Sequence, residues 1–132
     1  MKSKKIGLQL LLAGMMALFF YGFATAQDKN LVVRVAKIVI DSAQLDNYKA
    51  ALKEGIETAV RVEPGVVSLY AVYEKDKPTH VMVFEIYANA DAYKSHIETP
   101  HFKKYKSATK DMVKSLELVD VVPIGLESKM KR

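Results

Sequence analysis

Four stretches of the chain have the composition of β-strands. They are rich in β-branched and aromatic residues, which favour extended backbone. We expect strands at residues 31–40, 66–74, 80–88 and 115–124. Only a short polar turn at 75–79 separates the second strand from the third, so these two are expected to form an antiparallel hairpin.

The segment between the first two strands has the spacing of an amphipathic helix. Asp41 and Ser42 are typical helix-start residues, and Glu63-Pro64-Gly65 is a turn that ends the helix. Apolar residues three or four positions apart would share one face of this helix: Leu45, Tyr48, Leu52, Ile56 and Ala59.

Two shorter helical pieces are expected between the third and fourth strands. Asn89 or Asp91 can cap the first piece, which carries His96. Thr99 can cap the second, with Pro100 in its first turn, where the missing N–H costs no hydrogen bond. The break between the two pieces therefore lies just after His96.

The resulting order is β-α-β-β-α-β, which predicts an α+β, ferredoxin-like fold. Two helices cover only one face of such a sheet, yet the third strand is apolar on both of its faces. Met82, Phe84 and Ile86 alternate with Val81, Val83 and Tyr87. A strand of this kind is usually buried on both sides. We therefore expect a homodimer formed through the sheet faces; the alternative is a single sheet with one exposed face.

The first 26 residues have the pattern of a secretory signal peptide. A basic start precedes an apolar run from Ile6 to Phe23, and Ala24-Thr25-Ala26 has the small residues of a cleavage site. Cleavage after Ala26 would leave a domain at 27–132, with a core at 31–124 and a charged tail at 125–132. The protein would then be periplasmic or secreted. The alternative is an uncleaved leader that anchors it to the membrane.

The charge balance gives no support to nucleic-acid binding. The whole chain has 20 Lys and Arg against 15 Asp and Glu, a net charge of +5. Three of the positive charges lie in the leader, which leaves a balance of only +2 for the mature chain. This is too small for the basic surface that nucleic-acid binding requires. The chain has no cysteine, which excludes disulfides, thiolate nucleophiles and cysteine-ligated metals.

Three histidines are the only side chains that normally titrate near neutral pH. His80 stands at the start of a strand, where a solvated histidine is common. His96 and His101 flank the expected helix break, a place where a small-molecule pocket can form; capping and packing are their structural alternative. Their spacing of five across a proline does not match a helical H-x-x-x-H metal site, so we expect no metal. Widely separated glycines argue against a nucleotide cofactor.

Glu85 interrupts an otherwise apolar strand, where an ionised carboxylate needs a partner. It is either paired with Arg34 or Lys37 on the first strand, or it is a base or the orienter of a histidine at a pocket floor. Aromatic residues could form the walls of such a pocket, although most of them could equally belong to the core. The candidates for contact with a ligand are Tyr70, Tyr73, Tyr93, Phe102 and Tyr105.

Three motifs resemble those of the antibiotic biosynthesis monooxygenase domain. They are the E-P-G turn at 63–65, the V-F-E-I-Y strand at 83–87 and the H-I-E-T-P-H-F segment at 96–102. The resemblance covers about residues 31–124 and is greatest to the small quinol monooxygenases. It implies a ferredoxin-like protomer, a dimeric α/β barrel and a pocket between helices and sheet.

The resemblance also implies oxygen chemistry without flavin, haem or metal. A base deprotonates a hydroxylated aromatic, and the electron-rich anion reacts with O2 to give a quinone. His101 or His96 would be that base, Glu85 would fix the imidazole tautomer, and the aromatic residues would hold the ring.

The chain differs from two branches of the family. Haem-degrading members need an Asn on the first strand, a Trp and a further His. Here the first strand has no Asn, His96 stands at the Trp position and Lys106 at the His position. Polyketide-tailoring members also use a tryptophan, and this chain has none. Other members of the same fold are isomerases of small carbonyl compounds.

The sequence therefore predicts an exported, cofactor-independent monooxygenase that oxidises a small quinol-like aromatic with O2. The alternatives are an isomerase of a small hydroxycarbonyl compound and a non-catalytic small-molecule binding protein on the same fold.

Overall fold

The computed structural model describes residues 30–130. The expected leader, residues 1–26, lies outside this range. Among the described residues, no helix has both the length and the apolar character needed to cross a membrane.

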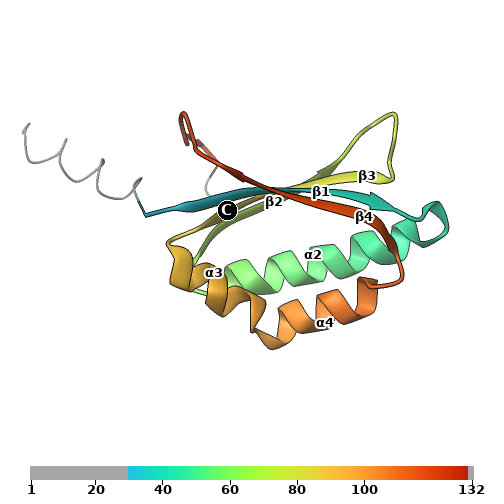
Figure 1. Cartoon of the computed structure of the whole chain (residues 1–132), viewed down its shortest axis with the longest axis horizontal. Coiled ribbons are helices and arrows are strands. Elements are labelled where there is room, and N and C mark those ends of the chain that lie inside the picture. Colours follow the sequence, from blue (N-terminus) through green and yellow to red (C-terminus); the bar gives the residue numbers. More distant parts are fainter. Residues whose placement is uncertain (1–29, 131–132) are drawn as a thin grey trace, which may run out of the picture. The chain divides into compact units, whose positions relative to one another are not determined.

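The described residues form the expected α+β, ferredoxin-like fold, a four-stranded antiparallel sheet with its helices on one side (Figure 1). The sheet order is β2-β3-β1-β4. The elements are β1 (Val32–Ile40), η1 (Ser42–Gln44), α2 (Leu45–Val62), β2 (Val66–Tyr73), β3 (His80–Tyr87), α3 (Ala90–Ile97), α4 (Pro100–Thr109) and β4 (Val113–Val121).

The capping residues explain where the helices begin. Asp41 caps the short 3-10 turn η1, and α2 begins three residues later than the Asp41-Ser42 pair predicts. Asn89 accepts a hydrogen bond from the Ala92 N–H at the start of α3. Thr99 caps α4, with Pro100 as its first residue. The two caps produce the expected break between α3 and α4.

The fourth strand is displaced by a few residues from the expected 115–124. It pairs with β1 from Val113, across a bulge at Val39 and Ile40, and ends at Val121. Pro123 follows soon after and has no N–H with which to extend the ladder.

The core lies between the sheet and the helices. Ala36, Ile38 and Val83 on the strands pack with the fully buried Tyr48 of α2 in one cluster. A second cluster joins the β2 and β3 ends to the C-terminal part of α2: Ala59, Val66, Leu69 and Tyr87.

Strand β4 is poorly covered by the helices. Leu116 and Leu118 pair with Ile38 and Ala36 on the helix-facing side of the sheet, yet they are 45% and 51% exposed. The gap between helices and sheet is therefore open along β4, and this opening defines the candidate site.

Candidate functional site

Glu63 is turned towards the space beneath the helix break by the proline that follows it. A residue before proline is disfavoured in the α conformation, and Glu63 is extended, with φ −100° and ψ 111°. Its backbone N–H still bonds to Ala59, so α2 ends at this position. Its side chain is largely buried.

His96 and His101 reach the same space from the two sides of the break. His96 lies in the last turn of α3, and His101 is the second residue of α4. Thr99 connects the two helices, because its hydroxyl donates to the His96 carbonyl at 2.7 Å and accepts from the Phe102 N–H at 3.3 Å. The break therefore fixes the direction of both imidazoles.

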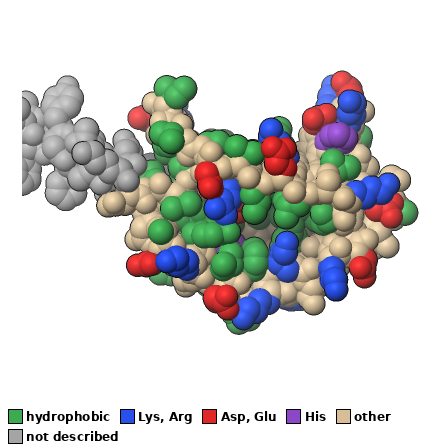
Figure 2. All heavy atoms as spheres, viewed as in Figure 1, with side chains coloured by type: hydrophobic (Ala, Val, Ile, Leu, Met, Phe, Trp, Pro, Cys, Tyr) green, Lys and Arg blue, Asp and Glu red, His purple; other side chains and the backbone are tan. Residues whose placement is uncertain are grey.

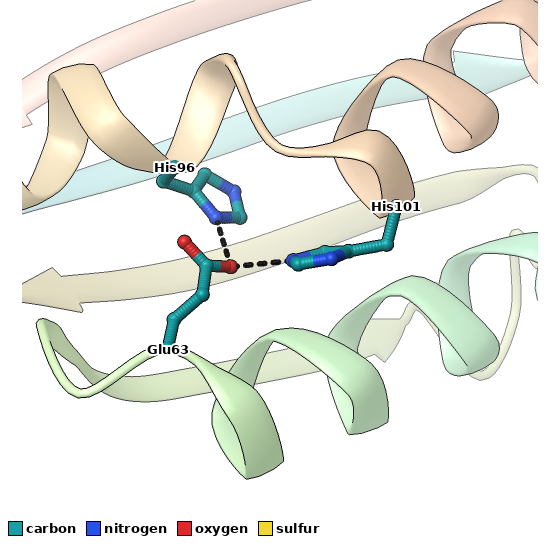
Figure 3. Close-up of side chains that lie close together, drawn as sticks. All are labelled: Glu63, His96 and His101. Atoms are coloured by element: carbon teal, nitrogen blue, oxygen red, sulfur yellow. Dashed lines mark hydrogen bonds and ion pairs between the residues drawn. The ribbon is translucent and has the colours of Figure 1, made fainter.

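The three side chains meet at one carboxylate oxygen (Figure 3). Glu63 Oε2 lies 2.9 Å from His96 Nδ1 and 2.6 Å from His101 Nε2. An ionised carboxylate only accepts hydrogen bonds, so each of these ring nitrogens carries a hydrogen in this arrangement. Glu63 thus fixes which nitrogen of each ring is protonated, a function that the sequence offered as one alternative for Glu85.

The tautomer leaves a free basic nitrogen on His96. No hydrogen-bond partner for its Nε2 lies within residues 30–130. Every fully buried side-chain nitrogen or oxygen in that range does have a partner, so an atom without one cannot be fully buried. Nε2 therefore retains some accessible surface, although the residue as a whole is buried. His96 lines an internal cavity, which is where this nitrogen can meet a ligand.

The cavity lies between the helices and the sheet and has a volume of about 120 Å³. A space of roughly this size can enclose one benzene ring. Figure 2 shows its mouth as a hollow bordered by hydrophobic side chains, with basic side chains at the edge. The polar and aromatic residues that line it are Arg34, Glu85, Tyr87, Tyr93, His96, His101, Phe102, Tyr105 and Lys106.

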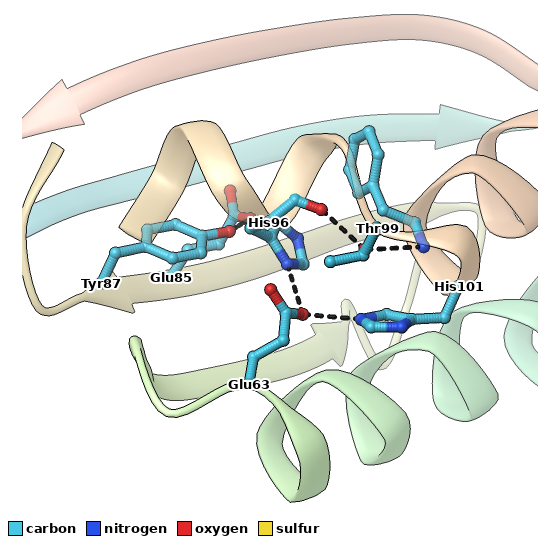
Figure 4. A network of polar contacts seen from close by, with 7 residues as sticks. Glu63, Glu85, Tyr87, His96, Thr99 and His101 are labelled. Atoms are coloured by element: carbon cyan, nitrogen blue, oxygen red, sulfur yellow. Dashed lines mark hydrogen bonds and ion pairs between the residues drawn. The ribbon is translucent and has the colours of Figure 1, made fainter. Parts of the chain in front are cut away.

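Glu85 lines the cavity from the sheet but does not contact the histidines through a hydrogen bond. Its carboxylate accepts from the Tyr87 hydroxyl at 2.7 Å (Figure 4). Burial raises the pKa of Glu85, an effect only partly offset by the Tyr87 hydrogen bond and the nearby His96 and Arg34. Burial and the Glu85 carboxylate together raise the pKa of Tyr87, so its hydroxyl remains a donor.

Neither Arg34 nor Lys37, the two cationic partners expected for Glu85, forms a hydrogen bond with its carboxylate. Arg34 faces Glu85 across β1 and β3, but its Nε donates to Asp120 at 2.8 Å and its guanidinium lies 4.2 Å from the centre of the Tyr93 ring. Lys37 lies on the opposite face of the sheet, since it is an odd number of residues from Arg34 along the strand. The partner of Glu85 is therefore the Tyr87 hydroxyl.

Six of the eight residues proposed for the site line this cavity: His96, His101, Glu85, Tyr93, Phe102 and Tyr105. Tyr70 and Tyr73 do not. Tyr70 pairs with Phe84 on the face away from the helices and is 46% exposed. Tyr73 faces the helices but lies near the far end of the gap, where Lys49 Nζ is 3.9 Å from its ring centre. Strand register separates Tyr70 from the cavity, and position along the strand separates Tyr73 from it.

Glu63 is the residue that the sequence analysis missed, because the E-P-G motif indicated only a turn. One signal was available. Glu63 follows the last residue of α2, and an acidic residue at a helix C-terminus opposes the helix dipole. A carboxylate at such a position suggests that a partner elsewhere compensates for it, and here the partners are two imidazoles.

These contacts define the chemistry that the site can perform. A neutral imidazole with one nitrogen held by a carboxylate can accept a proton at the other, and the carboxylate then stabilises the imidazolium. The surrounding walls are apolar and aromatic and suit a flat, small ligand.

The comparisons with known proteins agree with the fold. The family model described as "Antibiotic biosynthesis monooxygenase" matches residues 31–108. None of the curated proteins compared with this chain matches it.

Solved structures provide closer relatives. A candidate antibiotic biosynthesis monooxygenase from Bacteroides thetaiotaomicron is 56% identical; the match covers 79% of this chain and 99% of that chain, with a TM-score of 0.75. A candidate monooxygenase from Lactobacillus acidophilus is 35% identical over 70% of this chain and 43% of that one, with a TM-score of 0.67. A Nitrosomonas europaea protein of 20% identity and TM-score 0.68, covering 72% of this chain and 91% of that chain, shares the fold.

Proposed function

The chain belongs to the antibiotic biosynthesis monooxygenase family, and on that premise we propose that it is an exported, cofactor-independent monooxygenase that oxidises a small quinol-like aromatic with O2. The single observation that carries the proposal is the arrangement of His96, which lines the cavity and whose Nδ1 faces Glu63 while its Nε2 has no hydrogen-bond partner within residues 30–130. Export rests on the leader-like pattern of residues 1–26.

In this proposal His96 is the general base. Its Nε2 accepts the phenolic proton, and Glu63 stabilises the imidazolium that forms. His101 also lines the cavity, but it borders a second surface groove as well, so it is the more open of the two rings. We assign His101 the second hydrogen bond to Glu63, which keeps that carboxylate oriented.

The substrate itself supplies the electrons. For a quinol with a ring C–H group next to a hydroxyl, reaction of its phenolate with O2 removes four electrons and two hydrogens and gives a hydroxyquinone. One oxygen atom of O2 becomes the new ring hydroxyl, and the other leaves as water. Each quinone formed therefore consumes one O2, and the reaction needs no external reductant.

The size and walls of the cavity favour a single aromatic ring. Its volume of about 120 Å³ is small beside the roughly 300–1,000 Å³ of pockets for drug-sized ligands. Phe102 lies with its ring centre 5.0 Å from that of His96, so a ring bound beside Phe102 would present its hydroxyl to the imidazole. Substituents of a larger substrate would extend through the mouth along β4.

The direct test is O2 uptake by residues 27–132 with a panel of hydroquinones, catechols and phenols, with autoxidation subtracted. Labelled O2 should place one labelled atom in the quinone. We expect His96→Ala to lower kcat by about 10²–10⁴-fold, with a smaller loss for His101→Ala and no loss for the distant His80→Ala.

Three outcomes would contradict the proposal. Uptake that is unchanged in His96→Ala would exclude this base. Product formation from hydroxycarbonyl compounds without O2 uptake would favour the isomerase. Saturable binding of aromatics without product would favour a binding protein.

We also propose that two protomers associate through the sheet faces that the helices leave open. Tyr70, Val72 and Met82 lie on this face by register and are 46%, 55% and 40% exposed. Contiguous exposed apolar side chains of this kind are typical of an interface. Sedimentation should give a dimer, and Val72→Lys should shift it towards monomer.

A further inference from the structure

The cluster of Glu63, His96 and His101 contains the donor atoms of a metal site. Two imidazole nitrogens and one carboxylate oxygen, contributed by three different segments, all lie within 4.8 Å of one another. Two histidines with one glutamate form catalytic zinc sites, and two histidines with a carboxylate bind non-haem iron. The histidine spacing alone did not indicate a metal, because the third donor is 33 residues from His96.

The carboxylate oxygen lies slightly closer to each imidazole nitrogen than an ion would hold it. With bonds of about 2.0–2.1 Å, donors around a tetrahedral zinc ion stand roughly 3.3 Å apart. The two carboxylate–imidazole pairs are at 2.9 and 2.6 Å, so each must open by about 0.4–0.7 Å to reach this separation. Glu63 Oε1 has no hydrogen-bond partner within residues 30–130, so the carboxylate can rotate without breaking a further hydrogen bond.

We propose that Glu63, His96 and His101 bind one divalent transition-metal ion, such as Zn²⁺, and that the bound ion inhibits the oxygenase. Binding replaces the two ring hydrogens that point at Glu63. Coordination through Nδ1 obliges the neutral His96 ring to carry its proton on Nε2. Nε2, the nitrogen proposed as the base, then becomes a hydrogen-bond donor and can no longer accept the phenolic proton.

Binding can be tested without reference to activity. The protein, residues 27–132 without a polyhistidine tag, is titrated with Zn²⁺ by calorimetry and with Co²⁺ by visible absorption. We expect one ion per chain and a tetrahedral Co²⁺ spectrum. Loss of a metal's outer-shell partner typically costs about 10–100-fold in affinity. Loss of a direct ligand should cost more, so His96→Ala and His101→Ala should each weaken binding by at least about 100-fold. His80→Ala, which removes the histidine outside the cluster, is the matched control.

A second measurement does not depend on whether the variants fold. X-ray absorption on the zinc-loaded wild-type protein should show two imidazoles and one carboxylate oxygen at about 2.0–2.2 Å. Absence of saturable binding, a spectrum without imidazole, or affinities equal to wild type in both histidine variants would overturn the site.

Only the inhibitory consequence rests on the proposed function. With an oxidisable substrate, O2 uptake should fall in proportion to zinc occupancy and return when a chelator is added. Uptake that rises with occupancy would overturn the inhibition and make the ion an activator. If no substrate is oxidised, the proposed function fails, whereas the calorimetry and X-ray absorption still decide whether the metal site exists.

Discussion

Two carboxylates lie close to the cavity, and they differ in what surrounds them. Glu63 stands behind His96 and His101 and accepts from both imidazoles through one oxygen. Glu85 lines the cavity itself and accepts from a tyrosine hydroxyl. Glu63 comes from the turn after α2, whereas Glu85 comes from a strand in the middle of the sheet.

The carboxylate that lines the cavity, Glu85, is therefore not the one that is hydrogen-bonded to the histidines. Glu63 has two partners that can each carry positive charge. Glu85 has a neutral partner, and burial raises its pKa. We therefore expect changes at Glu63 to alter turnover, and changes at Glu85 to alter mainly the pH dependence of stability.

The largest expected effect is that of Glu63→Gln on turnover. The amide is similar in size but carries no charge to stabilise an imidazolium, and its NH2 group can turn towards a ring nitrogen and favour the wrong tautomer. Replacing the carboxylate behind a catalytic histidine in this way costs up to about 10⁴-fold in kcat, and we expect a loss of about 10²–10⁴-fold here.

Glu85→Gln, measured beside Glu63→Gln, tests which carboxylate sets the tautomer of His96. NMR of ring-labelled histidine should show a hydrogen on His96 Nδ1 in wild type and in Glu85→Gln, and a changed pattern in Glu63→Gln. A kcat loss that is larger in Glu85→Gln than in Glu63→Gln would reverse the assignment of the two carboxylates.

A smaller effect is expected for Gly65→Ala, which alters the Glu63 end of the gap. Gly65 has no positive φ; it is needed because a Cβ there would lie 2.5 Å from the Ala92 Cβ in α3. The clash would push α3, and with it His96, away from the turn that carries Glu63. Overpacking of this kind costs about 1–3 kcal/mol of unfolding free energy.

The Gly65→Ala prediction has two matched controls. Gly125→Ala meets no atom within 4 Å and should leave stability unchanged. Ala92→Gly added to Gly65→Ala should recover much of the loss, which a double-mutant cycle in urea would measure. Additive losses in the cycle would mean that the contact does not limit the packing of α3.

Sequence patterns predicted the fold better than the site. The strands, the caps at Asn89 and Thr99 and the break after His96 follow from local chemistry, and the structure confirms them. Glu63 could not be assigned in the same way, because its partners are 33 and 38 residues away and only the tertiary fold brings them together. The same limit applies to Tyr70, whose side depends on a register that shifts between Val66 and Ser68.

The smallest expected effect is that of Glu85→Gln on unfolding free energy. Burial raises the pKa of Glu85 above the ordinary value of 4.5, so the folded state holds this proton more tightly than the unfolded state does. As the pH rises from 4.5 through the raised pKa of Glu85, the free energy of unfolding of the wild type falls. Glutamine has no such titration, and its carbonyl can still accept from Tyr87.

The difference in unfolding free energy between Glu85→Gln and wild type should therefore be small well below pH 4.5. It should increase as the pH rises and should favour the variant at neutral pH. Urea unfolding on both sides of that value measures it. Tyr87→Phe removes a hydrogen bond that lowers the pKa of Glu85, so it should steepen the loss of stability with pH. A variant that is less stable than wild type at neutral pH would mean that the Glu85 charge is compensated in the folded state, which would make Glu85 resemble Glu63 and remove the contrast between the two carboxylates.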